Sequence, residues 1–300
     1  MMKKRRLVFR GTGTALVTPF KKDGSVDEVV MRELVDRQIK AKVEALVPVG
    51  STGEGATLSE EEQAQVIDIV VDQVRGRIPV IGGASANSTR KAVALAQEAK
   101  RHGADAILTV APFYNKPTQE GLYQHFGAIA EAVEIPVIIY NVPGRTASNI
   151  EAATALRLAD DSPFIAGIKE ASANLPQIMD LLARRPEGFG VWSGDDNLAL
   201  PLVALGADGI ISVVSNEIPA EFGTMIRYAL KGRYSKAREL HYRYLRLMNL
   251  NFIESNPIPV KAAMAMMDLL DDSYRLPLTP IGSSARSPLE QELRKLHLIR

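Results

Sequence analysis

The sequence predicts an α/β protein in which one (β/α)8 TIM barrel is followed by a C-terminal extension of three helices. Eight short apolar segments recur along the chain, and longer stretches with helical periodicity separate them. Strands that alternate with helices form right-handed βαβ units around a parallel sheet. No change in composition divides the first 233 residues, which favours one closed barrel. Two doubly wound domains are the alternative, because 300 residues fit either architecture.

The eight apolar segments are the predicted strands. They are rich in Val and Ile, and Gly or Pro bounds most of them. They alternate little between polar and apolar residues, as is typical of parallel strands that are covered on both faces. The segments cover residues 14–18, 45–49, 79–83, 106–110, 136–140, 164–169, 190–193 and 209–213.

The stretches between these strands are predicted to be helices. Ser59 and Glu62 have the spacing of a capping box, in which each side chain bonds the backbone N–H of the other residue. Apolar residues at helical spacing follow between Ala64 and Val74. Residues 88–101 and 119–133 show the same periodicity.

The chain after residue 233 departs from this alternation. Helices are predicted over residues 234–252, 258–270 and 288–296, and four prolines separate them: Pro257, Pro259, Pro277 and Pro280. We therefore divide the chain into a barrel, residues 1–233, and a helical extension, residues 234–300. We expect the extension to pack on the barrel and to enlarge an oligomer surface.

Composition excludes several classes of protein. The net charge is +1, from 36 basic and 35 acidic residues, so no basic excess points to nucleic acid or an anionic membrane. The absence of cysteine excludes a disulfide, a thiolate nucleophile and a zinc-thiolate site. The basic start, Met1 to Arg6, precedes an apolar run too short for a signal peptide, and no run approaches the ~20 residues of a membrane span. We expect a cytoplasmic protein with a short basic tail.

Lys169 is the strongest catalytic candidate, because it ends the apolar segment 164–169. Active sites of (β/α)8 barrels lie at the carboxyl ends of the strands. Side chains alternate along a strand, so Lys169 and Glu170 face opposite sides. Burial would lower the pKa of an inward Lys169, and its neutral amine could then attack a ketone to form an imine. The alternative is a lysine that extends to solvent. If Lys169 faces inward, the sequence predicts Schiff-base chemistry of the class I aldolase type.

Three further features surround this position. Tyr140 ends another strand and could move protons during imine formation, or could equally be a core tyrosine. Residues 50–55 (GSTGEG) could bind a small carboxylate through N–H groups and hydroxyls, or form a plain turn. Arg145 could bind a carboxylate with two N–H groups, or lie in solvent.

Other chemistries lack their signatures. The four histidines are scattered along the chain, and none ends a predicted strand, as the ligands of a zinc-dependent aldolase would. The segment 11–13 (GTG) lacks the third glycine of a dinucleotide fingerprint. We expect no metal ion and no cofactor.

Four segments together resemble one family closely. They are residues 50–54 (GSTGE), 140–143 (YNVP), 167–170 (GIKE) and 193–196 (SGDD), in the order and spacing of the dihydrodipicolinate synthase/N-acetylneuraminate lyase superfamily. The resemblance runs from about Gly11 to the C-terminal helices. The synthase branch is the most similar, through residues 112–117 (PFYNKP), Arg145 and residues 256–261 (NPIPVK).

The resemblance implies substrates, roles and an assembly. The substrates are pyruvate and aspartate 4-semialdehyde. Lys169 forms an imine with pyruvate, and Ser51 and Thr52 hold the pyruvate carboxylate. Thr52, Tyr140 and Tyr114 form a proton relay, with Tyr114 supplied by a neighbouring subunit. Arg145 binds the carboxylate of the semialdehyde, and Gly194 and Ile211 line the pocket. The assembly is a homotetramer built from two tight dimers.

Two departures from the synthase branch affect these expectations. Ser51 replaces the usual threonine, and serine is common in the lyase branches. The lysine-feedback site of some members is also altered: only Asn87 matches, whereas Gly55, Glu60, Gln63, Lys91 and Phe113 do not. Lys91 would repel the ammonium group of the effector, so we predict weak or absent inhibition by lysine.

Two competing functions remain. A retro-aldol lyase for N-acetylneuraminate or a 2-keto-3-deoxy sugar acid would not need Arg145, because a polyol chain carries no carboxylate. A barrel that binds keto acids without turnover would not need Lys169 together with the relay hydroxyls.

Overall fold

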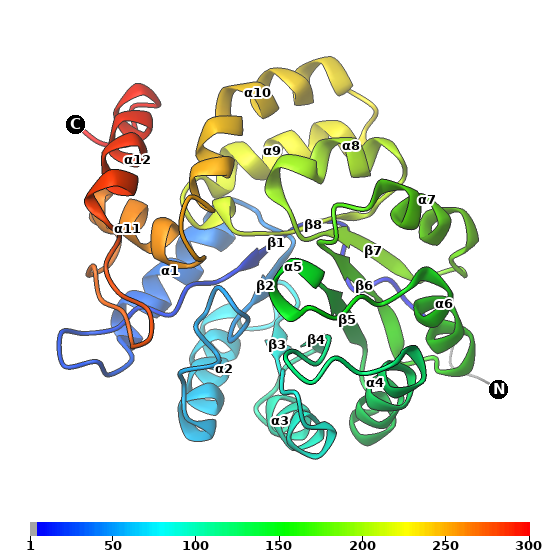
Figure 1. Ribbon diagram of the computed structural model, residues 1–300. Coiled ribbons are helices and arrows are strands. Elements are labelled where there is room, and N and C mark those ends of the chain that lie inside the picture. The colour runs from blue at the N-terminus through cyan, green and yellow to red at the C-terminus, as the bar shows by residue number, and fades with distance from the viewer. Residues whose placement is uncertain (1–4) are drawn as a thin grey trace.

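The computed structural model describes residues 5–300, and eight parallel strands form its centre. The sheet runs in the order β2-β1-β8-β7-β6-β5-β4-β3, and a parallel bridge between Leu46 and Val80 joins its two ends. Helices surround this barrel (Figure 1). The predicted (β/α)8 barrel is therefore confirmed. Residues 1–4 of the basic start lie outside the described residues, and the Arg5 guanidinium bonds the carbonyl oxygens of Ala159, Ser162 and Ile165.

Every residue of the eight strands is buried, as their apolar sequences predicted. Each predicted segment overlaps one strand. The strands are β1 (Gly11–Ala15), β2 (Ala45–Val47), β3 (Ile81–Gly83), β4 (Ala106–Val110), β5 (Val137–Asn141), β6 (Ile165–Glu170), β7 (Gly190–Ser193) and β8 (Gly209–Ser212).

The predicted position of the first strand was wrong by three residues. We expected residues 14–18, whereas β1 covers Gly11–Ala15. The structure needs small residues here, because β1 and β8 approach closely. A Cβ atom on Gly209 would lie 1.9 Å from the carbonyl oxygen of Gly11. Gly209 also has a φ of +148°, which L side chains rarely adopt.

Helices alternate with the strands, and a side-chain cap begins four of them. Ser59 and Glu62 form the predicted capping box at the start of α2. The helices are α1 (Glu28–Lys40), α2 (Glu60–Val74), α3 (Thr89–Arg101), α4 (Gln119–Val133), α5 (Pro143–Thr146), α6 (Ala152–Asp161), α7 (Leu175–Arg184), α8 (Ala199–Ala204), α9 (Pro219–Leu230), α10 (Tyr234–Leu250), α11 (Ile258–Met266) and α12 (Ser283–Lys295). Two short 3-10 turns, η1 (Asp196–Leu198) and η2 (Val214–Asn216), follow β7 and β8.

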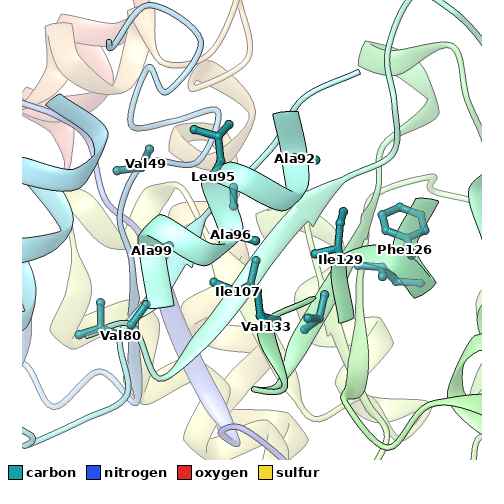
Figure 2. Close-up of a cluster of buried hydrophobic side chains, with 14 of the residues drawn as sticks. Val49, Val80, Ala92, Leu95, Ala96, Ala99, Ile107, Phe126, Ile129 and Val133 are labelled. Carbon is teal, nitrogen blue, oxygen red and sulfur yellow. The ribbon is translucent and has the colours of Figure 1, made fainter. Parts of the chain in front are cut away.

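The main apolar core lies between the barrel and its helices. Figure 2 shows the part between α3, α4 and β4, where Ala96 and Ala99 of α3 and Ile129 of α4 gather around Ile107 of β4. Each of these four residues is at most 1% exposed. A second cluster fills the inside of the barrel with side chains such as Ala45, Ile81 and Ile138. The barrel is therefore a packed core and not a pore.

Three helices follow residue 233, and the last differs from its prediction. Helices α10, α11 and α12 share an apolar cluster with α8 and α9 of the barrel, and they lie along one side of it in Figure 1. We expected the last helix to start at Pro288, but α12 starts at Ser283 and contains Pro288. No helix among residues 5–300 is long and apolar enough to cross a membrane.

Candidate active site

A cavity of about 300 Å³ opens at the carboxyl ends of the strands. Six of the predicted site residues line it: Ser51, Thr52, Tyr140, Arg145, Lys169 and Gly194. They come from β5, β6, α5 and the loops after β2 and β7. Segments that lie far apart in the sequence therefore meet at the edge of the barrel where such sites form.

Lys169 faces the cavity, and its neighbour Glu170 faces the helix layer. The Glu170 carboxylate accepts hydrogen bonds from Asn141 Nδ2 at 3.2 Å and from the Ser172 N–H at 2.7 Å. It also accepts one from Gln177 Nε2 of α7 at 3.4 Å. This outward network fixes the end of β6, and strand alternation then directs Lys169 inward.

Burial makes the Lys169 amine easier to deprotonate. Its side chain is 5% exposed, and removal from water lowers its pKa to about 8. Arg145 acts in the same direction, while Asp195 and Asp196 oppose the shift. At neutral pH about one amine in ten is then neutral, which is far more than for an ordinary lysine. Lys169 is therefore suited to nucleophilic attack on a carbonyl carbon.

Tyr140 lies directly beside this amine. The two residues are register partners on β5 and β6, and Lys169 Nζ is 4.3 Å from the centroid of the Tyr140 ring. Burial raises the pKa of Tyr140, so its phenol stays protonated at neutral pH. Within residues 5–300, no residue hydrogen-bonds to this hydroxyl. It is free to exchange a proton with a bound molecule.

The loop after β2 presents two hydroxyls of different character. Ser51 is exposed toward the cavity, whereas Thr52 is buried. Thr52 Oγ1 accepts a hydrogen bond from Asn256 Nδ2 at 2.9 Å, while no described residue bonds the Ser51 hydroxyl. The turn needs glycine at residue 55, because a Cβ atom there would lie 2.4 Å from the Val49 carbonyl oxygen.

Arg145 stands at the mouth of the cavity on the short helix α5. One of its terminal nitrogens, Nη2, donates to the backbone carbonyl oxygen of Asn256 at 3.1 Å. The remaining N–H groups can meet an anion, since guanidinium carries five donors. On the opposite wall, Gly194 leaves room for the amine: a Cβ atom there would lie 3.1 Å from Lys169 Cε and 2.6 Å from Ala171 Cβ.

Two predicted residues lie outside the cavity lining of this chain. Ile211 is fully buried inside the barrel, two positions below Val213, which takes the lining position on the same side of the chain. A role for Ile211 in lining the pocket therefore stays a prediction. Tyr114 is 87% exposed, with a φ of +74°, in the loop after β4. No contact in the single chain places it in the cavity.

The structure adds two polar residues, Asp195 and Asn256, that sequence reasoning had not assigned to the site. Asn256 lines the cavity and bonds both Thr52 and Arg145. It lies in residues 256–261, a segment already noted for its family resemblance, but no sequence pattern gave it a contact. Among residues 5–300, no three His, Cys, Asp or Glu side chains are grouped as a metal ion would require.

A buried lysine with a lowered pKa lies at the carboxyl edge of this (β/α)8 barrel, beside a phenol and a guanidinium. This arrangement defines a Schiff-base-forming lyase of the class I aldolase type. The comparison with known proteins narrows this class. The chain belongs to the dihydrodipicolinate synthetase family, whose model matches residues 8–296. The predicted family is therefore confirmed.

The relatives are similar over almost their whole length. The 4-hydroxy-tetrahydrodipicolinate synthase of Koribacter versatilis is 55% identical over 283 residues, or 94% of each chain. That of Chloroherpeton thalassium is 51% identical over 298 residues, 99% of this chain and 98% of the relative. The crystal structure of the Aquifex aeolicus dihydrodipicolinate synthase matches with a TM-score of 0.95 and 44% identity. The match covers 97% of this chain and 99% of that chain. The structure of the Acinetobacter baumannii dihydrodipicolinate synthase complexed with pyruvate matches with a TM-score of 0.94 and 46% identity. The match covers 97% of this chain and 99% of that chain.

Proposed function

We propose that this chain condenses pyruvate with aspartate 4-semialdehyde to give 4-hydroxy-tetrahydrodipicolinate, the step that leads to diaminopimelate and lysine. One observation carries the proposal: the buried amine of Lys169 shares a single cavity with Tyr140, a pair of hydroxyls and Arg145. The high identity to relatives that bear this enzyme's name supports it.

The reaction begins with the capture of pyruvate. The neutral Lys169 amine attacks the keto carbon, and the carbinolamine then loses water to give an iminium ion. Loss of a proton from the methyl carbon gives the enamine. We assign Ser51 and Thr52 to the pyruvate carboxylate, which two hydroxyls on the cavity wall can bond. We assign Tyr140 to the transfer of protons to and from the carbinolamine oxygen.

The second substrate supplies the aldehyde. The enamine carbon attacks the aldehyde carbon, and the resulting alkoxide takes up a proton. The amino group of the condensed chain then attacks the iminium carbon, closes the ring and releases the Lys169 amine. Arg145 at the cavity mouth is the group that we assign to the carboxylate of the semialdehyde, since guanidinium binds a carboxylate with two N–H groups.

We propose that Thr52, Tyr140 and Tyr114 relay the protons of these steps, with Tyr114 reaching in from a neighbouring subunit. The high exposure of Tyr114 in the single chain supports a role across an interface. Ser51 is the alternative to Thr52 in this relay. Its hydroxyl faces the cavity without a partner among the described residues, whereas Thr52 already bonds Asn256.

The assembly, the location and the division of the chain are parts of the same proposal. We propose a homotetramer of two tight dimers in the cytoplasm, with residues 1–233 as the catalytic barrel and 234–300 as the extension. The absence of cysteine is compatible with a reducing compartment. Light scattering of the purified protein tests the tetramer.

A coupled assay tests the reaction. The chain is incubated with pyruvate and aspartate semialdehyde, and a downstream reductase reports the product. We expect turnover that requires both substrates, and no cleavage of N-acetylneuraminate or of 2-keto-3-deoxy sugar acids. Cleavage of a sugar acid without condensation would instead assign the chain to the lyase branch, and an Arg145→Ala variant with unchanged condensation would remove its assigned role.

A further inference from the structure

We propose that Asp195 binds the ammonium group of aspartate 4-semialdehyde, so that Asp195 and Arg145 hold the two charged groups of one amino acid. Arg145 takes the carboxylate, as already assigned, and Asp195 takes the cation on the same carbon. The inference rests on the proposed function and deepens it, because it names the residue that recognises the second substrate as an amino acid.

The backbone of Asp195 is fixed at the carboxyl end of β7. Its N–H donates to the Ser193 hydroxyl at 3.2 Å, and its carbonyl oxygen accepts from the same hydroxyl at 2.8 Å. The Leu198 N–H donates to that carbonyl oxygen at 3.1 Å. These three bonds fix the point at which the Asp195 side chain leaves the cavity wall.

The Asp195 carboxylate itself has no partner in the part of the chain that the structure describes. It stands at the N-cap of η1 but makes no capping bond there, and no described residue hydrogen-bonds or ion-pairs with it. The neighbouring Asp196 differs, because its carboxylate accepts from the N–H groups of Val213 and Val214 at 3.2 and 2.8 Å. Asp196 thus holds backbone, whereas Asp195 lines the cavity and can meet a ligand.

The surroundings of Asp195 favour a cationic ligand. The residue is half-buried, and burial raises the pKa of its carboxyl group because the ionised form loses part of its hydration. An ammonium group that enters the cavity would replace this hydration with a charge-assisted hydrogen bond. A carboxylate would meet repulsion at the same point.

The Lys169 amine does not supply this cation when the second substrate binds. The two groups affect each other's pKa, yet no ion pair joins them among the described residues. The amine is already consumed in the adduct with pyruvate, and the enamine that attacks the aldehyde carries no charge on its nitrogen. The positive charge of Lys169 is therefore absent at this stage, and the incoming ammonium group can take its place beside Asp195.

Arg145 and Asp195 are placed to hold one small molecule between them. Both line the cavity of about 300 Å³, and both act electrostatically on the pKa of Lys169 and of Tyr140. No ion pair joins them in the described chain, and Arg145 instead donates to the backbone carbonyl oxygen of Asn256. Two opposite charges that stay unpaired in one small cavity can receive the two charges of a zwitterion.

The test compares two semialdehydes that differ only in the ammonium group. Succinic semialdehyde has the carboxylate and the aldehyde of aspartate 4-semialdehyde but no amine. Pyruvate is kept saturating, so that the pKa of the Lys169 amine does not affect the comparison. We measure the KM for aspartate semialdehyde and the inhibition constant of succinic semialdehyde against it. In the wild type we expect the KM to be at least about tenfold lower than the inhibition constant.

Asp195→Asn removes the charge and keeps the size of the side chain. We expect the KM for aspartate semialdehyde to rise by about tenfold to a hundredfold, while the inhibition constant of succinic semialdehyde stays near that of the wild type. Asp180→Asn is the matched control, because it removes the same charge from an exposed pair with Arg184 on α7. Both constants should stay unchanged in this control.

The outcomes separate recognition of the ammonium group from other roles. An equal change in both constants would show that Asp195 acts on the enamine or on the shape of the cavity, and would overturn the inference, as would an unchanged KM. If thermal unfolding shows that Asp195→Asn does not fold, the wild type decides: equal affinity for the two semialdehydes overturns the inference, and a tenfold preference supports it. A wild type that condenses both substrates but fails these comparisons refutes the role of Asp195 alone, whereas a wild type without condensation refutes the proposed function.

Discussion

Lys169 Nζ lies 4.3 Å from the centroid of the Tyr140 ring, and the two residues are partners on adjacent parallel strands. The register of the barrel therefore brings an amine and a phenol to the same point without any help from a loop. Sites on regular elements hold their geometry more closely than sites on loops. Both groups can reach one keto carbon and the oxygen attached to it.

The reaction of Lys169 with pyruvate should depend on pH in a defined way. The pKa of this amine is lowered to about 8, chiefly by burial. Only the neutral amine attacks, so the rate of adduct formation should rise about tenfold per pH unit below 8 and level off above it. Stopped-flow measurement of the wild type from acid to alkaline pH checks this. A profile that keeps rising to the pKa of an ordinary lysine would contradict the assignment of a buried nucleophile.

Removal of the Tyr140 hydroxyl should slow the chemistry without unfolding the protein. Tyr140→Phe keeps the ring that packs inside the barrel. The hydroxyl has no partner among the described residues, so its loss leaves no polar group unpaired. We expect kcat to fall by about 10²–10³-fold, which is typical of a lost proton-transfer group, and Tm to change little. A variant with near wild-type kcat would assign the proton transfer to another group.

The Lys261–Glu54 pair should be costly to break from one side. Both side chains are fully buried, at 2.5 Å. Lys261→Met leaves the Glu54 carboxylate without its partner in the interior, and we expect a loss of about 3–5 kcal/mol in the free energy of unfolding. Adding Glu54→Gln to Lys261→Met should recover much of that loss, because no buried charge then remains. Urea unfolding of the wild type, Lys261→Met and the double variant measures the free energy of unfolding of each protein. A loss below about 1 kcal/mol in Lys261→Met would argue against the ion pair.

Lysine should inhibit this protein weakly or not at all. Lys91 Nζ lies 3.5 Å from Glu60 Oε1, so this surface already carries its own ammonium group. The Asn87 side chain donates to the Phe113 carbonyl oxygen at 3.4 Å. An added lysine would meet repulsion from Lys91. A steady-state titration with lysine checks the prediction, and strong inhibition that persists in Lys91→Ala would show that an effector site is built from other residues.

The sequence predicted those parts of the structure that depend on local patterns. Apolar segments located all eight strands, and the Ser59–Glu62 spacing located the start of α2. Strand alternation predicted that Lys169 and Glu170 face opposite sides, and the structure shows that Lys169 is the one that faces the cavity. The predicted start of β1 was wrong. Gly11 and Gly209 let two strands approach closely, and neither segment alone shows that contact.

The long-range contacts of the site were beyond such patterns. Asn256 meets Thr52 across 204 positions of the chain, and nothing in its own neighbourhood predicts a bond to that partner. The same holds for Lys261 and Glu54, 207 positions apart. The depth at which a strand residue such as Ile211 lies likewise depends on where the barrel opens. Contacts of this kind follow only from the closed barrel and the helices packed beside it.

Reductive trapping at Lys169 tests the central claim most directly. The wild type and Lys169→Ala are each incubated with pyruvate and borohydride, and the modified residue is located by mass spectrometry of the digested protein. We predict that the wild type carries one pyruvate-derived group on Lys169, and that Lys169→Ala carries none. A wild type that stays unmodified, or an adduct that persists in Lys169→Ala, would contradict the assignment of this amine as the nucleophile.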